Sequence, residues 1–113
     1  LEILDQVEEF HFFFREPDYE KELLFWKNRN TDEIKNSLAE VQKVIKNTGV
    51  EDKEKLRQAL DELGKRLGDR GLVYWPFRVA LTGEKTSPDP VDIAHILSEA
   101  DVIERIKRAV NKI

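Results

Sequence analysis

Hydrophobic residues recur every three or four positions along most of the chain, which is the period of an α-helix. Such stripes cover residues 1–14, 34–45, 56–67 and 102–113. The alternating pattern of a half-buried strand is nearly absent. The sequence therefore predicts an all-α fold.

Residues that favour helix ends divide these stripes into separate helices. Pro17 ends the first helix, because a proline disfavours helical geometry at the residue before it, and a short helix is expected over residues 19–26. Asn30 or Thr31 provides the N-cap of the next helix. Gly68 ends the one after that, since glycine readily adopts the left-handed conformation that follows a helix.

The segment over residues 72–81 fits two kinds of structure. Residues 73–75 (Val-Tyr-Trp) favour a strand, whereas Pro76 suits the first turn of a helix, and apolar residues then recur at helical spacing. We predict a helix that begins at about Pro76 and ends at Gly83.

Two further helices are expected at the end of the chain. Ser87 followed by Pro88 is typical of a helix start, with a capping hydroxyl and then proline at the first helical position. Ser98 with Asp101 three residues later resembles a capping box. Residues 1–113 are thus predicted to form one region of about six helices. A division of this region into two helical subdomains, 1–67 and 72–113, is possible.

Composition excludes several classes of protein. With 40% hydrophobic and 37% charged residues, the chain is neither disordered nor membranous. No apolar run approaches the roughly 20 residues that a membrane span requires. The absence of cysteine excludes a disulfide scaffold. Because the chain has no methionine and begins at Leu1, we expect it to be a fragment of a longer polypeptide.

Charge is unevenly distributed, although the net charge is only −4. Residues 1–20 contain seven acidic side chains and one arginine, whereas residues 64–88 contain five basic and two acidic side chains. Such a basic stretch is expected in a protein that contacts phosphate with one face. A solvated helix surface would show the same pattern.

No combination of residues predicts catalysis or metal binding by this chain. The glycines form no phosphate-binding loop, and His11 and His95 lie far apart in sequence. The acidic pairs fall on solvated helix faces, at Glu8-Glu9 and Asp61-Glu62. Among the aromatic residues, Phe10, Phe14, Phe25 and Phe77 fit the core, whereas Tyr74 and Trp75 fit either the core or a base-stacking surface.

Two motifs carry a resemblance to a known family. Residues 76–83 read Pro-Phe-Arg-Val-Ala-Leu-Thr-Gly and are followed by Ser87-Pro88. This resembles the anticodon-binding domain of bacterial-type glutamyl-tRNA synthetases, whose last part reads approximately Pro-Leu-Arg-x-Ala-Leu-Thr-Gly, a short loop and Ser/Thr-Pro. Residues 12–19 are similar to the Phe-Phe-x-x-Pro-x-Tyr passage that opens the same domain. The chain departs from the family at Glu84, Asp89 and residues 98–100, where positive charge or glycine is replaced.

The resemblance implies a helical cage of the kind found in class I aminoacyl-tRNA synthetases. The parent enzyme would be a cytoplasmic, monomeric glutamate–tRNA ligase that uses ATP and magnesium in a domain preceding this fragment. The fragment itself would need no cofactor and would bind the anticodon loop of glutamate tRNA, not DNA or a membrane. A helical protein-interaction module without an RNA role is the alternative function.

The resemblance also implies which residues bind RNA. Arg78 offers a planar set of donors to a base edge or a phosphate, and the loop after Gly83 leads to a helix whose positive end would point outward. The predicted RNA-binding residues are Arg78, Thr82, Gly83, Ser87, Pro88 and Pro90, of which Thr82 and Gly83 shape the turn. Without the resemblance, Arg78 fits a surface ion pair, Ser87 a cap and Pro88 a helix start.

Overall fold

The computed structural model describes residues 19–84 and 88–113. Over these residues it contains five α-helices, one short 3-10 helix and no strand, which confirms the all-α prediction. The elements are η2 (Lys21–Leu24), α2 (Thr31–Thr48), α3 (Lys53–Leu67), α4 (Arg70–Thr82), α5 (Pro90–Ile96) and α6 (Glu99–Lys112). The helix predicted over residues 1–14 lies outside the described residues. The short helix predicted over residues 19–26 is the 3-10 helix η2.

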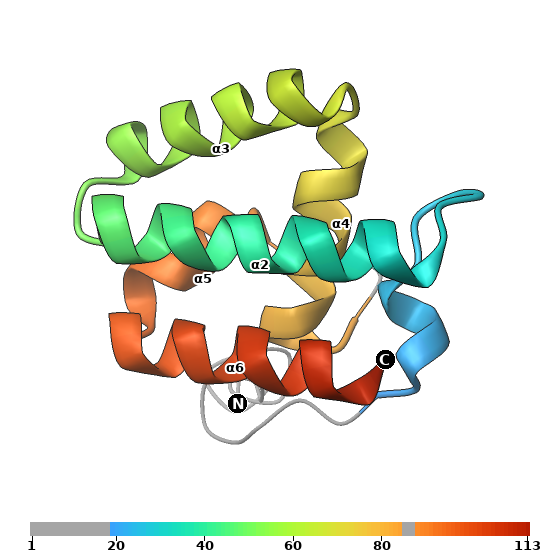
Figure 1. Ribbon diagram of the computed structural model, residues 1–113. Coiled ribbons are helices and arrows are strands. Elements are labelled where there is room, and N and C mark those ends of the chain that lie inside the picture. The colour runs from blue at the N-terminus through green and yellow to red at the C-terminus, as the bar shows by residue number, and fades with distance from the viewer. Residues whose placement is uncertain (1–18, 85–87) are drawn as a thin grey trace.

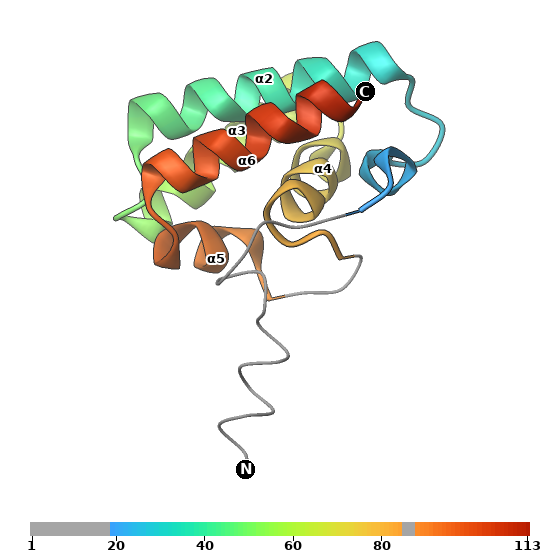
Figure 2. The same cartoon turned by 90° about the horizontal axis from the view of Figure 1, so that it is seen from below.

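The helices enclose α4. In Figure 1, α2 lies between α3 and α6, and α4 crosses behind them. In Figure 2, which views the molecule from below, α4 and α5 lie on the side of α2 and α6 that faces away from the viewer in Figure 1. α4 contacts η2, α2, α3, α5 and α6, and apolar side chains from all of them form one hydrophobic core. The division into helical subdomains stays a prediction, and both of its parts contribute to this core.

Most predicted helix ends are confirmed, because they depend on residues close in sequence. Asn30 caps α2 through a capping box, in which its side chain accepts from the Glu33 amide and the Glu33 side chain accepts from the Asn30 amide. Gly68 ends α3 in the left-handed conformation, with φ of 79°. Ser98 caps α6 by accepting from the Asp101 amide.

The predicted start of α4 at Pro76 is wrong, because the helix begins at Arg70 and contains Pro76 in its interior. A proline inside a helix removes the hydrogen bond to the carbonyl four residues earlier, here that of Leu72. The Ser37 hydroxyl of α2 donates to this carbonyl at 2.7 Å. The helix therefore continues through Pro76 because a side chain from α2 replaces the missing donor.

The predicted start of the next helix at Ser87-Pro88 is also wrong. α5 begins at Pro90, and Asp89 is its N-cap, accepting from the Val91 amide at 2.9 Å. Asp89-Pro90 has the same cap-then-proline chemistry as Ser87-Pro88, so the sequence offers two starts. The residues that follow pack as expected, with Val91, Ala94 and Leu97 buried.

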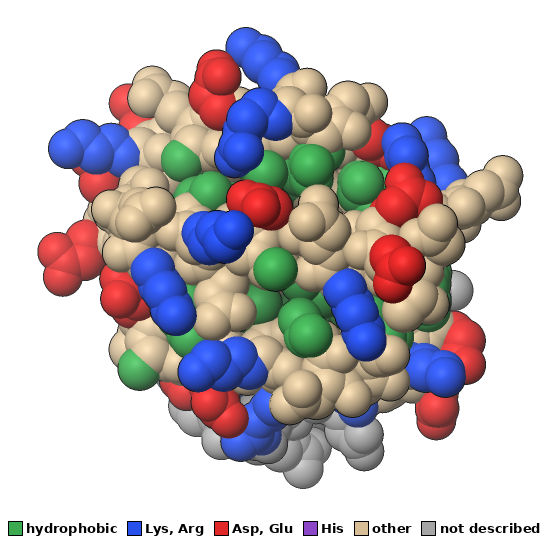
Figure 3. Space-filling view, in the orientation of Figure 1, with side chains coloured by type: hydrophobic (Ala, Val, Ile, Leu, Met, Phe, Trp, Pro, Cys, Tyr) green, Lys and Arg blue, Asp and Glu red, His purple; other side chains and the backbone are tan. Residues whose placement is uncertain are grey.

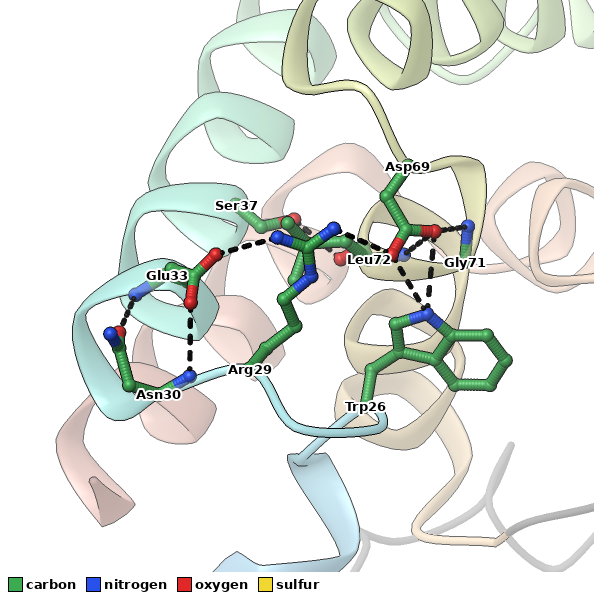
Figure 4. Close-up of polar contacts among 8 residues, drawn as sticks. All are labelled: Trp26, Arg29, Asn30, Glu33, Ser37, Asp69, Gly71 and Leu72. Carbon is green, nitrogen blue, oxygen red and sulfur yellow. Dashed lines mark hydrogen bonds and ion pairs between the residues drawn. The ribbon is translucent and has the colours of Figure 1, made fainter.

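A polar network fixes the start of α4 against the loop before α2 (Figure 4). The Asp69 carboxylate accepts from the Gly71 amide at 3.0 Å, from the Trp26 indole at 3.2 Å and from Arg29 at 3.0 Å. Arg29 also pairs with Glu33 at the start of α2. One carboxylate thus caps α4 and holds the loop that precedes α2.

The two aromatic residues that the sequence left open are half-buried and bonded to the protein. The Tyr74 hydroxyl donates to Asp61 at 2.7 Å, and the Trp75 indole donates to the Leu23 carbonyl at 2.9 Å. Phe77 is fully buried. Tyr74 and Trp75 therefore help to hold α3 and η2 against α4.

The outer face formed by α2, α3 and α6 carries mixed charge. Lys and Arg side chains are interspersed there with Asp and Glu, and small apolar areas lie between them (Figure 3). Within the described part of the chain, no helix combines the length and apolarity needed to cross a membrane.

Candidate nucleic-acid interface

Arg78 lies on α4, one turn before the end of the helix. Its side chain is half-buried, and the guanidinium Nε is buried without a hydrogen-bond partner among the described residues. A buried donor without an acceptor is uncommon, because its desolvation typically costs about 1–3 kcal/mol. Arg78 therefore retains hydrogen-bonding capacity that the described residues do not use.

The turn after Arg78 is built by Thr82 and Gly83. Thr82 is almost fully buried, and its hydroxyl donates to the Arg78 carbonyl at 2.9 Å and accepts from the Glu84 amide at 3.1 Å. Gly83 ends α4 with φ of 71°, a conformation that side chains with a Cβ rarely adopt. Both residues thus occupy the turn, and the Thr82 hydroxyl is already bonded within it.

A buried arginine from α6 supports the same turn. The Arg105 guanidinium donates to the Leu81 carbonyl at 2.6 Å, and only 6% of the residue is exposed. The carbonyls of the last helical turn have no partner within the helix. Burial lowers the pKa of Arg105, while the charge of Asp101 opposes this effect. Arg105 therefore anchors the end of α4 to α6.

The segment that leads into α5 forms a corner of two prolines around Asp89. Pro88 is exposed, whereas Pro90 is buried at the first position of α5. Ser87 lies outside the described residues. The N-terminus of α5 is capped by the Asp89 carboxylate, and the expectation that it points outward stays a prediction. At this corner, Pro88 is exposed and Asp89 is partly exposed.

An ion pair connects this corner to α3. Arg57 Nη1 donates to Asp89 at 2.7 Å, and Lys53 pairs with Asp92 at 3.3 Å. Burial raises the pKa of the Asp89 carboxyl, but the bond from Arg57, the Val91 amide and the charges of Arg57 and Arg78 hold it below its ordinary value. The hydrogen bond to Asp89 also raises the pKa of Arg57.

The structure thus brings five of the predicted residues to one end of α4 and the start of α5. Thr82 and Gly83 form the turn beside Arg78, and the charge of Arg78 acts on Asp89 between Pro88 and Pro90. The sequence did not indicate Arg57 or Arg105 as part of this region. Neither has a local signal, because each acts through an acceptor at least 24 positions away.

Other candidate groups do not form a reactive site among residues 19–84 and 88–113. His95 is exposed, and its Nδ1 lies 3.0 Å from the Val50 carbonyl. No group of three His, Cys, Asp or Glu side chains in these ranges could hold a metal ion.

Comparison with known proteins agrees with the resemblance to glutamyl-tRNA synthetases that the sequence motifs carry. The chain is similar to proteins named glutamate–tRNA ligase from three bacteria. It is 34% identical over 122 residues to that of Clostridium acetobutylicum and 30% identical over 118 residues to that of Clostridium tetani, covering 100% and 99% of this chain and 24% of each relative. It is 33% identical over 98 residues to that of Carboxydothermus hydrogenoformans, covering 82% of this chain and 20% of the relative.

The chain spans about a quarter of the length of these relatives. No solved structure matches it significantly. The profile of a family described as anticodon binding domain matches residues 2–110. This match favours an RNA-binding domain and does not support the alternative of a protein-interaction module. Because the profile spans nearly all of its residues, the chain belongs to the anticodon-binding domain family.

Proposed function

We propose that this chain is the anticodon-reading domain of a glutamate–tRNA ligase, with glutamate tRNA as its partner. The family is that of anticodon-binding domains, and the relatives are named glutamate–tRNA ligase. The parent enzyme would join glutamate to tRNA with ATP and magnesium, in a part of the polypeptide that this chain does not contain. It would act as a monomer in the cytoplasm.

The observation that carries the proposal is the arrangement of Arg78. Its side chain is half-buried, its buried Nε has no acceptor among the described residues, and it lies one turn before the glycine turn that ends α4. Single-stranded RNA loops are read by hydrogen bonds to the edges of splayed bases and by stacking on planar groups. A guanidinium supports both kinds of contact.

The six predicted residues divide into two roles in this proposal. Arg78 and Pro88 would contact the RNA, because their side chains are at least partly accessible. Thr82, Gly83 and Pro90 would shape the turn and the corner, since Thr82 and Pro90 are buried and Gly83 provides the left-handed end of α4. The role of Ser87 rests on the family resemblance.

Binding of glutamate tRNA to the full-length enzyme tests the proposal. A tRNA with one substituted anticodon base should bind about 10-fold more weakly, since a base contact typically contributes 1–3 kcal/mol. A substitution in the acceptor stem that keeps its base pairing serves as the control for binding elsewhere. Equal affinity for all anticodon variants would contradict an anticodon-reading function.

A further inference from the structure

Arg57 is a second guanidinium at the proposed RNA-reading corner. It lies on α3, and its Nη1 reaches Asp89 at 2.7 Å. Asp89 in turn is close enough to Arg78 for the charge of that arginine to act on its carboxyl. Asp89 is therefore bonded to a guanidinium of α3 and lies within range of the charge of a second guanidinium, on α4.

Contacts between α3 and α4 place Arg57 beside the face of α4 that carries Tyr74 and Arg78. The Tyr74 hydroxyl lies 3.5 Å from the Arg57 carbonyl and bonds to Asp61, so this side of α4 faces α3. Arg78 follows Tyr74 by four residues, and residues at this spacing share one face of a helix. Arg57 thus lies beside the row that Tyr74 and Arg78 form.

The Arg57 guanidinium also has donors to spare. Within residues 19–84 and 88–113 it donates only to Asp89, through Nη1, and 37% of its side chain is exposed. A guanidinium can bind two acceptors at once because its donors form a planar fork. Asp89 therefore binds one donor of the group, and part of the Arg57 side chain remains exposed.

We propose that Arg57 is a further RNA-binding residue, which contacts a backbone phosphate of the same RNA whose base Arg78 reads. Asp89 orients the guanidinium in the free protein and remains bonded to it in the complex. The proposal rests on the proposed function, since it requires that RNA binds beside Arg78. Its chemistry is that of a charge-assisted hydrogen bond from nitrogen to a phosphate oxygen.

The salt dependence of tRNA binding tests this assignment, because each phosphate contact contributes roughly 0.7–0.9 to the slope of log affinity against log salt. The full-length Asp89→Asn enzyme is compared with the Arg57→Gln/Asp89→Asn enzyme, so that no unpaired carboxylate remains in either. Asparagine keeps the capping acceptor of α5. Loss of Arg57 should weaken binding about 10-fold near physiological salt and lower the slope by roughly 0.7–0.9. Arg57→Lys in the same background should retain the slope.

The pair of Lys43 and Glu40 on α2, at 3.4 Å, provides a matched control. Glu40→Gln is compared with Lys43→Gln/Glu40→Gln, which also removes one positive charge from an ion pair and should leave the slope unchanged. A loss of affinity without a greater change of slope than in the control pair would make Arg57 a structural residue and overturn the proposal. Unchanged affinity would overturn it too. If Arg78→Gln also leaves binding unchanged, the proposed function itself fails.

Discussion

The Ser37 hydroxyl donates to the Leu72 carbonyl at 2.7 Å, at the position where Pro76 cannot supply the helical hydrogen bond. Ser37 is fully buried on α2, and Leu72 is in the first turn of α4. This contact allows a proline in the interior of the central helix. It also joins α2 to the helix that carries Arg78.

The first prediction concerns this contact. Ser37→Ala leaves the Leu72 carbonyl buried without its side-chain donor, and we expect the free energy of unfolding to fall by about 1–3 kcal/mol. In the Pro76→Ala background the amide of residue 76 can donate instead, so the same substitution should cost less. Urea unfolding of the four variants measures both values. An equal cost in the two backgrounds would show that Pro76 is not the reason for the contact.

The second prediction concerns the packing of Gly71 against Trp26. A Cβ at residue 71 would lie 2.3 Å from the Trp26 ring, closer than any ordinary contact. Gly71→Ala should therefore displace the indole, weaken its bond to Asp69, and lower the free energy of unfolding by about 1–3 kcal/mol. In the Trp26→Ala background the ring is absent, and the added methyl group should cost much less. Thermal unfolding of these variants distinguishes the two cases.

A third prediction concerns acid. Burial raises the pKa of Asp69, but the hydrogen bonds from Arg29, Leu72, Trp26 and Gly71 together hold it below its ordinary value. A carboxyl with a lowered pKa in the folded state stabilises the fold above its unfolded pKa, near 4, and loses this contribution as the pH falls through the folded pKa.

The chain should therefore lose stability below about pH 4, and Asp69→Asn should show a smaller loss over the same interval. Unfolding free energies measured between pH 2 and pH 7 check this expectation. Identical pH profiles for Asp69→Asn and the parent chain would rule out a contribution from Asp69.

The fourth prediction concerns Arg105. Arg105→Met keeps much of the side-chain volume but removes the donor to the Leu81 carbonyl, so the free energy of unfolding should fall by about 1.5–3 kcal/mol. Arg108→Met, on the exposed face of the same helix, should cost less than about 1 kcal/mol, as is usual for exposed ion pairs. Similar losses for the two variants would contradict a specific role for the buried guanidinium.

Sequence patterns predicted the helices that are determined by residues close together in the chain. α2, α3 and α6 follow from apolar stripes at helical spacing, together with the caps of α2 and α6 and the glycine that ends α3. The start of α4 could not be predicted in this way. Pro76 looks like a helix start, and the residue that makes it tolerable is Ser37, 35 positions earlier.

The start of α5 was ambiguous for another reason. Ser87-Pro88 and Asp89-Pro90 carry the same local signal, and the choice of Asp89 goes together with its ion pair to Arg57 on α3. Arg78 was predicted as a site residue because it lies within a motif. Arg57 and Arg105 were not, because an arginine on a helix face gives no indication of the distant acceptor that fixes it.

The most direct test measures the coupling between Arg78 and the anticodon in the full-length enzyme. Affinities of the parent and Arg78→Gln enzymes are determined for glutamate tRNA and for tRNAs with each anticodon base substituted in turn. We predict that Arg78→Gln weakens binding of the natural tRNA about 10-fold and that this loss largely disappears for a tRNA substituted at the base that Arg78 reads. The same loss for every tRNA, or no loss for any of them, would contradict base reading by Arg78.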